Sequence, residues 1–130
     1  HEVARPSRPG VSLVARWMDA ARDGRPIEVR ADDPARDWTY TPDLASALVR
    51  LVAGPPARRP VHVGSPHVVR DLELASWISD EVGGGEVVRV PAGARVKAPM
   101  VPSDLSALQD LPWTTPRDGV RALVEAGAVA

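Results

Sequence analysis

The chain of 130 residues contains no cysteine and no phenylalanine. Without cysteine, disulfides, thiol catalysis and cysteine metal sites are excluded, and the three histidines (His1, His62, His67) do not have the spacing of metal ligands. No apolar run approaches the roughly 20 residues that cross a bilayer. The N-terminus, as it stands, has no apolar stretch typical of a secretory signal. These features predict a cytoplasmic protein with no metal site and no membrane partner.

An excess of one charge is also lacking, because 16 basic and 17 acidic residues give a net charge of −1. We therefore expect no nucleic-acid partner. Aromatic residues are scarce, with four Trp and one Tyr, so Val, Leu and Ala must fill the core. The length suits one domain with a modest core. We predict an extended lead-in over residues 1–10, followed by a single domain over residues 11–130.

Apolar spacing alternates along the chain between the helical and the strand period. Helices are predicted over residues 13–23, 44–52, 71–82 and 105–111, with a last helix after Thr115, and short strands over residues 27–29, 38–41, 60–63 and 86–90. Asp43 is expected to cap the second helix, whose apolar stripe is Leu44, Leu48, Leu51 and Val52. Helices that alternate with short strands indicate an α/β fold.

The most informative segment is residues 36–43 (RDWTYTPD), a charged pair that leads through aromatic residues into a helical pattern. Three other blocks accompany it: residues 24–29 (GRPIEV), residues 60–66 (PVHVGSP) with the LELA that follows, and residues 104–120, which contain DLS and LPWTTP. In this order the blocks resemble the C-terminal half of the extended short-chain dehydrogenases/reductases, the NAD-dependent nucleotide-sugar epimerases and dehydratases. Pro66, Ala107 and Pro112 depart from the family pattern and weaken the subfamily assignment.

The sequence has neither a Gly-rich dinucleotide fingerprint nor a Tyr-x-x-x-Lys pair. The resemblance therefore implies the nucleotide-sugar-binding portion of an epimerase or dehydratase, without its N-terminal Rossmann half. Such a portion is not catalytic on its own, has no catalytic residue to assign and binds no cofactor, whereas NAD(P) is expected in the intact parent enzyme. Its expected partners are a nucleotide-sugar and either the missing Rossmann half or further copies of the chain.

In that family, the arginine of the Arg-Asp-aromatic block commonly contacts the diphosphate of the substrate, and Arg36 matches it. A planar guanidinium can bind phosphate oxygens in a bidentate manner. Arg95 is the nearest candidate for a second family arginine. Trp38 could stack on the nucleotide base or pack in the core. For Arg36 and Asp37 the alternative is an ion pair that fixes a turn.

Two other interpretations of the whole chain stay open. The first is a free-standing, non-catalytic module, derived from the family, that binds a nucleotide or a protein; the missing Tyr-x-x-x-Lys pair fits it equally well. The second is a small α/β domain whose resemblance to the family is accidental. None of the three interpretations identifies the base, the sugar or the type of reaction.

Overall fold

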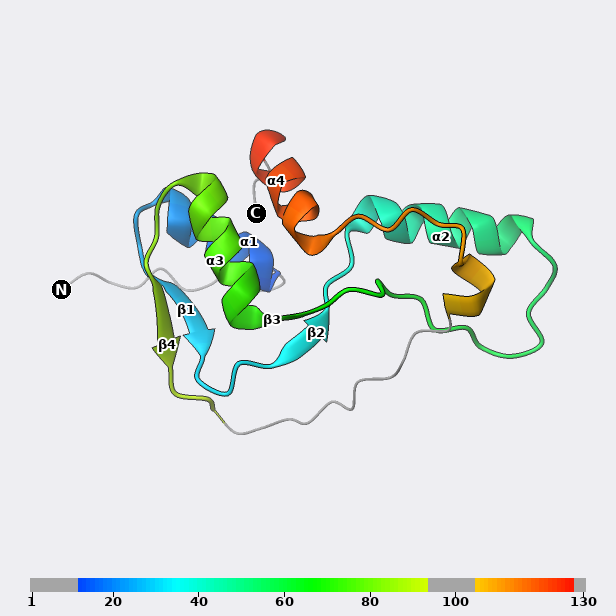
Figure 1. Cartoon of the computed structure of the whole chain (residues 1–130), viewed down its shortest axis with the longest axis horizontal. Helices are drawn as coiled ribbons and strands as arrows, with labels where there is room; N and C mark the ends of the chain where they lie inside the picture. The colour runs from blue at the N-terminus through cyan, green and yellow to red at the C-terminus, as the bar shows by residue number, and fades with distance from the viewer. Residues whose placement is uncertain (1–11, 94–104, 128–130) are drawn as a thin grey trace.

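The computed structural model describes residues 12–93 and 105–127 (Figure 1). Both the predicted lead-in and Arg95 lie outside these ranges. The elements in chain order are α1 (Leu13–Arg22), β1 (Ile27–Arg30), β2 (Ala35–Asp37), α2 (Thr41–Ala53), β3 (Val68–Arg70), α3 (Asp71–Val82), β4 (Val87–Val90), a short 3₁₀ turn η1 (Leu105–Leu108) and α4 (Pro116–Glu125). Helices alternate with short strands, as the sequence predicts.

The centre of the fold is a parallel pair of strands, β1 and β4, in which Ile27 lies opposite Val87. Helices α1 and α3 both contact β1 and pack against each other. Strand β1 buries Ile27 and Val29 and exposes Glu28 between them, as expected of a strand with one covered face. The indole N–H of Trp17 donates to the carbonyl of Glu28 at 3.0 Å, which ties α1 to β1.

Helix α3 is the hub of the core, because it contacts α1, α4, β1, β3 and β4. Ala75 and Ile78 are fully buried, whereas Leu72 and Val82 pack at the edge of the core. The chain leaves α3 through Gly85, whose φ is +85° and where a Cβ atom would lie 2.9 Å from the Cα of Ala21. The main core consists of Trp17, Met18, Ala20, Ala21, Ile27, Val29, Val69, Leu74, Ala75, Ile78 and Val120.

Strands β2 and β3 form a separate antiparallel pair, with Arg36 opposite Val69. This corrects two predictions, since neither residues 38–41 nor residues 60–63 form a strand. The side chain of Trp38 turns toward the core, and the hydroxyl of Thr39 accepts a hydrogen bond from the N–H of Ser65 at 2.9 Å. The strand therefore lies just before Trp38. In the described part of the chain, residues 60–63 pair with no strand.

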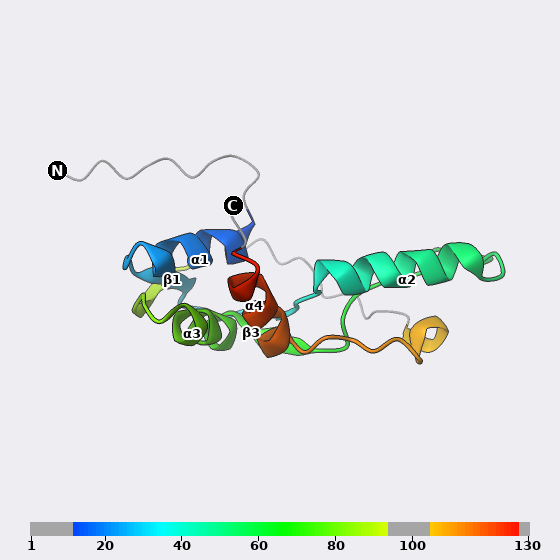
Figure 2. The ribbon, with the colours of Figure 1, turned by 90° about the horizontal axis from the view of Figure 1, so that it is seen from above.

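Helix α2 projects from the rest of the molecule (Figures 1 and 2). Its start also differs from the prediction, because Asp43 lies inside the first turn and Tyr40 occupies the N-cap position. The carboxylate of Asp43 instead accepts hydrogen bonds from the backbone N–H and the hydroxyl of Thr114, at 2.6 and 3.0 Å. A contact 71 residues away in the chain thus replaces the local cap.

Helix α2 is poorly covered. Ala47 is its buried residue, and it packs in a second, smaller cluster with Leu108 and Leu111. Of the predicted apolar stripe, Leu48 is 50% exposed and Val52 is 87% exposed. By contrast, the last helix agrees with its prediction, since the Thr115 hydroxyl accepts from the N–H of Asp118 at 3.2 Å and caps α4. No helix among the described residues is long and apolar enough to cross a membrane.

Candidate functional site

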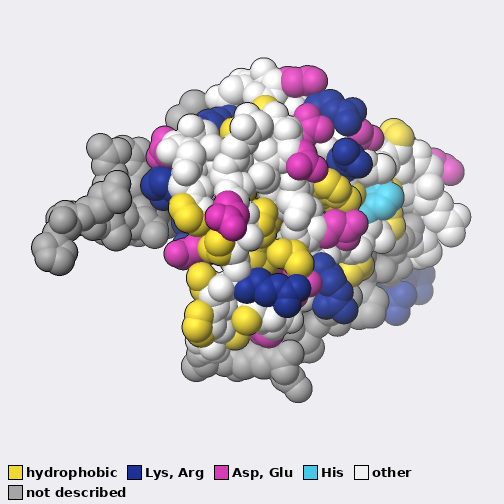
Figure 3. Space-filling model, turned by 60° about the vertical axis from the view of Figure 1, so that its left-hand side comes forward, with side chains coloured by type: hydrophobic (Ala, Val, Ile, Leu, Met, Phe, Trp, Pro, Cys, Tyr) yellow, Lys and Arg dark blue, Asp and Glu magenta, His cyan; other side chains and the backbone are white. Residues whose placement is uncertain are grey.

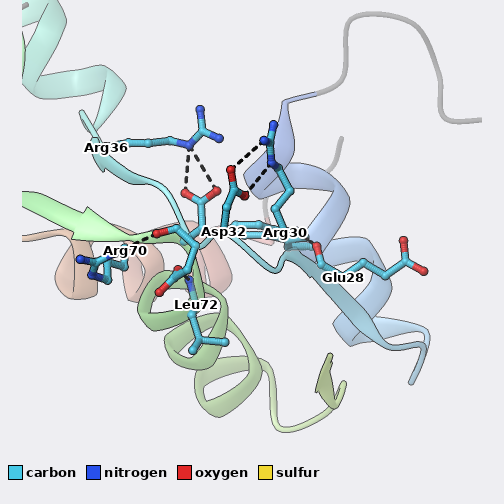
Figure 4. A network of polar contacts seen from close by, with 9 residues as sticks. Glu28, Arg30, Asp32, Arg36, Arg70 and Leu72 are labelled. Carbon is cyan, nitrogen blue, oxygen red and sulfur yellow. Dashed lines mark hydrogen bonds and ion pairs between the residues drawn. The ribbon is translucent and has the colours of Figure 1, made fainter. Parts of the chain in front are cut away.

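Arg36, the middle residue of β2, forms an ion pair with Asp71, the first residue of α3 (Figure 4). Its Nε donates to both carboxylate oxygens of Asp71, at 2.9 and 3.2 Å. The Asp71 side chain is only 1% exposed, whereas that of Arg36 is 43% exposed. A carboxylate in the first turn of a helix is also stabilised by the helix dipole. The pair thus joins a fixed, buried anion to a cation that reaches the surface.

The geometry of this pair leaves part of the guanidinium unused. Neither terminal nitrogen of Arg36, Nη1 or Nη2, has a partner among the described residues. The guanidinium carbon lies 5.9 Å from the centre of the Trp38 ring, within the range of a cation–π contact. Arg36 is therefore held from two directions while two of its nitrogens remain available to a ligand.

A second charged pair lies next to the first. Arg30 uses both Nε and Nη2 to bind the two carboxylate oxygens of Asp32, at 3.0 and 2.8 Å. The hydrogen bond to Asp32 and the charge of Asp32, with a smaller effect from Asp71, raise the pKa of Arg30 above its usual value. In Figure 4 Arg36 and Arg30 approach from opposite sides, with Asp32 between them. Two cations and two anions thus share one small region.

The loop before β2 is tied to the start of α3. The carboxylate of Asp33 accepts from the N–H of Leu72 at 2.8 Å, and the carbonyl of Asp33 accepts from the guanidinium of Arg70 at 3.0 Å. The N–H of Asp71 donates to the carbonyl of Pro34 at 3.1 Å. These bonds leave the first turn of α3, and with it Asp71, little freedom to move.

Trp38 packs against the main core, with its ring centre 6.2 Å from that of Trp17. Its indole nitrogen is buried and has no hydrogen-bond partner in the described part of the chain. A small cavity of about 60 Å³ lies beside this ring, between Tyr40, Thr114 and Val120. Trp38 therefore packs against the core in this structure, and its stacking on a nucleotide base stays a prediction.

The structure brings Arg36 and Trp38 together, whereas Arg95 lies outside the described residues. Arg36 pairs with Asp71 and not with Asp37, the partner expected in the alternative interpretation. Asp71 was missed from the sequence, where it reads only as an acidic residue at a helix start. Within residues 12–93 and 105–127, no group of three His, Cys, Asp or Glu residues could hold a metal ion. Basic and acidic side chains are interspersed on the face in Figure 3, which shows no broad field of one sign.

Comparison with known proteins gives a structural match and no sequence match. No family model and no curated protein sequence matches the chain. Among solved structures, the dTDP-glucose 4,6-dehydratase of Bacillus anthracis str. Ames, determined in complex with NAD, is similar with a TM-score of 0.71 and 18% identity. The chain shares the fold of part of that dehydratase. The match covers 88% of this chain and 38% of that one, and at this identity it shows the fold alone.

Proposed function

We propose that the chain is the nucleotide-sugar-binding portion of an NAD(P)-dependent epimerase or dehydratase and is not catalytic on its own. The observation that carries the proposal is Arg36, which presents at the surface two nitrogens without a partner in the described part of the chain, from a fold shared with part of a dTDP-glucose dehydratase. Arginine binds phosphate oxygens with two parallel hydrogen bonds, and its positive charge is constant at physiological pH.

In this proposal Arg36 contacts the diphosphate of the nucleotide-sugar. Trp38 supports the guanidinium from one side and lies near the nucleotide, and Arg95 supplies a second cation. The diphosphate would add negative charge to a region in which Asp32 and Asp71 already offset Arg30 and Arg36. Contacts outside these four residues must therefore contribute to affinity, and Arg95, the candidate that the resemblance gives, is one of them in this proposal.

The glycine run at residues 83–85 does not fit the cradle that a dinucleotide requires. A dinucleotide-binding loop places its amides at the beginning of a helix. Residues 83–85 instead end α3, and the N–H of Gly83 is bonded to the carbonyl of Ser79 at 2.9 Å. Gly85 packs directly on Ala21. We therefore assign NAD(P) to another part of the parent enzyme and expect none to be bound by this chain.

The test is direct binding of UDP and TDP to the purified chain by isothermal titration calorimetry. Arg36→Ala is expected to weaken binding at least tenfold, because it removes both phosphate donors. The matched control is Arg16→Ala, an exposed arginine on α1 with no side-chain partner in the described part, which should bind as the wild type does. Absence of binding to either nucleotide, or an Arg36→Ala variant of unchanged affinity, contradicts the proposal. So does measurable turnover of NAD by this chain.

The exposed side of α2 supports the proposal of a protein partner, which is either the missing Rossmann half or another copy of the chain. Leu48, Val49 and Val52 are 50%, 69% and 87% exposed, and they are neighbours on one helix. An open groove of about 640 Å³ runs along α2 near Val49 and Leu111. Large apolar side chains clustered at the surface are typical of a docking site. We propose that this side of α2 packs against a dinucleotide-binding half or, when that half is absent, against another copy of the chain.

Sedimentation velocity over a range of concentrations tests this partner. We expect concentration-dependent association of the wild-type chain, and its loss when Leu48 and Val52 are both replaced by serine. Because Leu48 is 50% and Val52 87% exposed, the free energy of unfolding of the monomer should change by no more than about 1 kcal/mol for the two substitutions together. A compact monomer at all concentrations, in the wild type as in the double variant, contradicts self-association.

A further inference from the structure

Four arginines of the described chain pair with a carboxylate through Nε, and three of them also use a terminal nitrogen. Arg121 directs Nε at Glu81 and Nη1 at Asp118. Arg25 and Arg30 each use two nitrogens, Nε and Nη2, to bind Asp23 and Asp32. Arg36 directs Nε alone at Asp71, and this single nitrogen lies within hydrogen-bond distance of both oxygens. Its two terminal nitrogens consequently have no partner among residues 12–93 and 105–127.

The two partners of this pair differ in their freedom. Asp71 is buried, and hydrogen bonds to Pro34 and Asp33 fix the backbone on either side of it. Arg36 is exposed along much of its length, and its other contact is the face of Trp38. An exposed arginine usually samples many rotamers, and ordering it is a large part of the entropy lost when it binds a ligand. An immobile carboxylate at Nε removes much of that freedom before the ligand arrives.

We propose that Asp71 is a positioning residue, which holds Arg36 by Nε so that Nη1 and Nη2 face outward as a preorganised fork for phosphate oxygens. The proposal rests on the proposed function in naming phosphate as the ligand. It also states something independent of any ligand, namely that the guanidinium of the free protein is already ordered through Nε. These two parts can be tested separately.

The first test uses the free chain and follows the Nε–H protons of its arginines by NMR. Hydrogen exchange at Nε of Arg36 should be at least tenfold slower than at Nε of the unpaired Arg16. Asp71→Asn, which neutralises the partner of Arg36, should greatly reduce the difference, while Asp23→Asn, which neutralises the partner of Arg25 by the same substitution, should leave Arg36 unchanged. Equally fast exchange at Arg36 and Arg16 in the wild type overturns the proposal, and this measurement stands even if Asp71→Asn does not fold.

The second test measures TDP affinity in a double-mutant cycle. Asp71→Asn is expected to weaken binding about tenfold in the wild-type background and to have no further effect when Arg36 is already alanine. Arg36→Lys should be as weak as Arg36→Ala, because a lysine that pairs with Asp71 has no fork to present. Equal effects of Asp71→Asn in both backgrounds would show a purely structural role and overturn the proposal. A wild type with slow exchange but no TDP binding would refute the proposed function while leaving Asp71 as the residue that orders Arg36.

Discussion

Replacing Asp43 by alanine should destabilise the protein far more than its place near the start of a projecting helix suggests. Its carboxylate accepts two hydrogen bonds from Thr114, at 2.6 and 3.0 Å, in a partly buried setting. A hydrogen bond to a charged group contributes about 1.5–3 kcal/mol, and a buried donor left without a partner carries its own penalty. Allowing for partial exposure, we expect Asp43→Ala to lower the free energy of unfolding by about 2–3 kcal/mol.

Urea denaturation followed by tryptophan fluorescence measures this change, and Trp113 lies next to the broken contact. With a slope of about 1–3 kcal/mol per molar urea, the midpoint should fall by about 1 M or more. Ser46→Ala is the matched control on the same helix, because the exposed Ser46 hydroxyl donates to the carbonyl of Pro42, at 3.0 Å, within its own helix. It should change stability by no more than about 0.5 kcal/mol. A loss below about 0.5 kcal/mol for Asp43→Ala would refute the reasoning.

Three further predictions concern the core and its boundaries. Ile78→Ala should lower the free energy of unfolding by about 2–5 kcal/mol and Ile78→Val by about 0.5–1.5 kcal/mol in the same assay, since Ile78 is completely buried. Gly83→Ala should lower the free energy of unfolding by about 1–2 kcal/mol, because the backbone at this position is left-handed and strains an alanine. Gly85→Ala should lower the melting temperature clearly more than Gly83→Ala does, because its new Cβ would also clash with Ala21. Equal decreases in the melting temperature for the two variants would contradict this explanation. Val52→Ser should leave the melting temperature unchanged at concentrations where the chain is monomeric, as the side chain is 87% exposed.

The sequence predicted those elements whose limits depend on local signals. Apolar spacing located α1 and α3, the cap at Thr115 located α4, and alternation located β1 and β4. The start of α2 could not be predicted, because the short acidic side chain that looks like a cap is used by Thr114, 71 residues away. The strand predicted over residues 38–41 lies at Ala35–Asp37 for a similar reason. Trp38 packs against Trp17, which is a contact between distant segments.

The candidate site likewise contains residues that the sequence could identify and one residue that it could not. Arg36 and Trp38 could be selected from one short segment by its resemblance to a family, and the structure places them in contact. Asp71 could not be selected, because its pairing with Arg36 spans 35 residues and depends on how β2 registers with β3. Whether Arg36, Trp38 and Arg95 bind a nucleotide-sugar stays a prediction, which the titrations above address.

The parallel pair of strands constrains the order in which this chain can fold. Each pair of opposite residues in β1 and β4 is 60 positions apart in the chain, from Ile27 with Val87 to Arg30 with Val90. The pairing of β1 with β4 therefore cannot form until about residue 90 has left the ribosome, after β2, α2, β3 and α3 have been synthesised. Contacts between distant residues slow folding, because the loop between them must close before any of these pairs forms. Early docking of α1 on β1, with the Trp17 indole bonded to the strand, would protect one face of β1 until β4 has been synthesised.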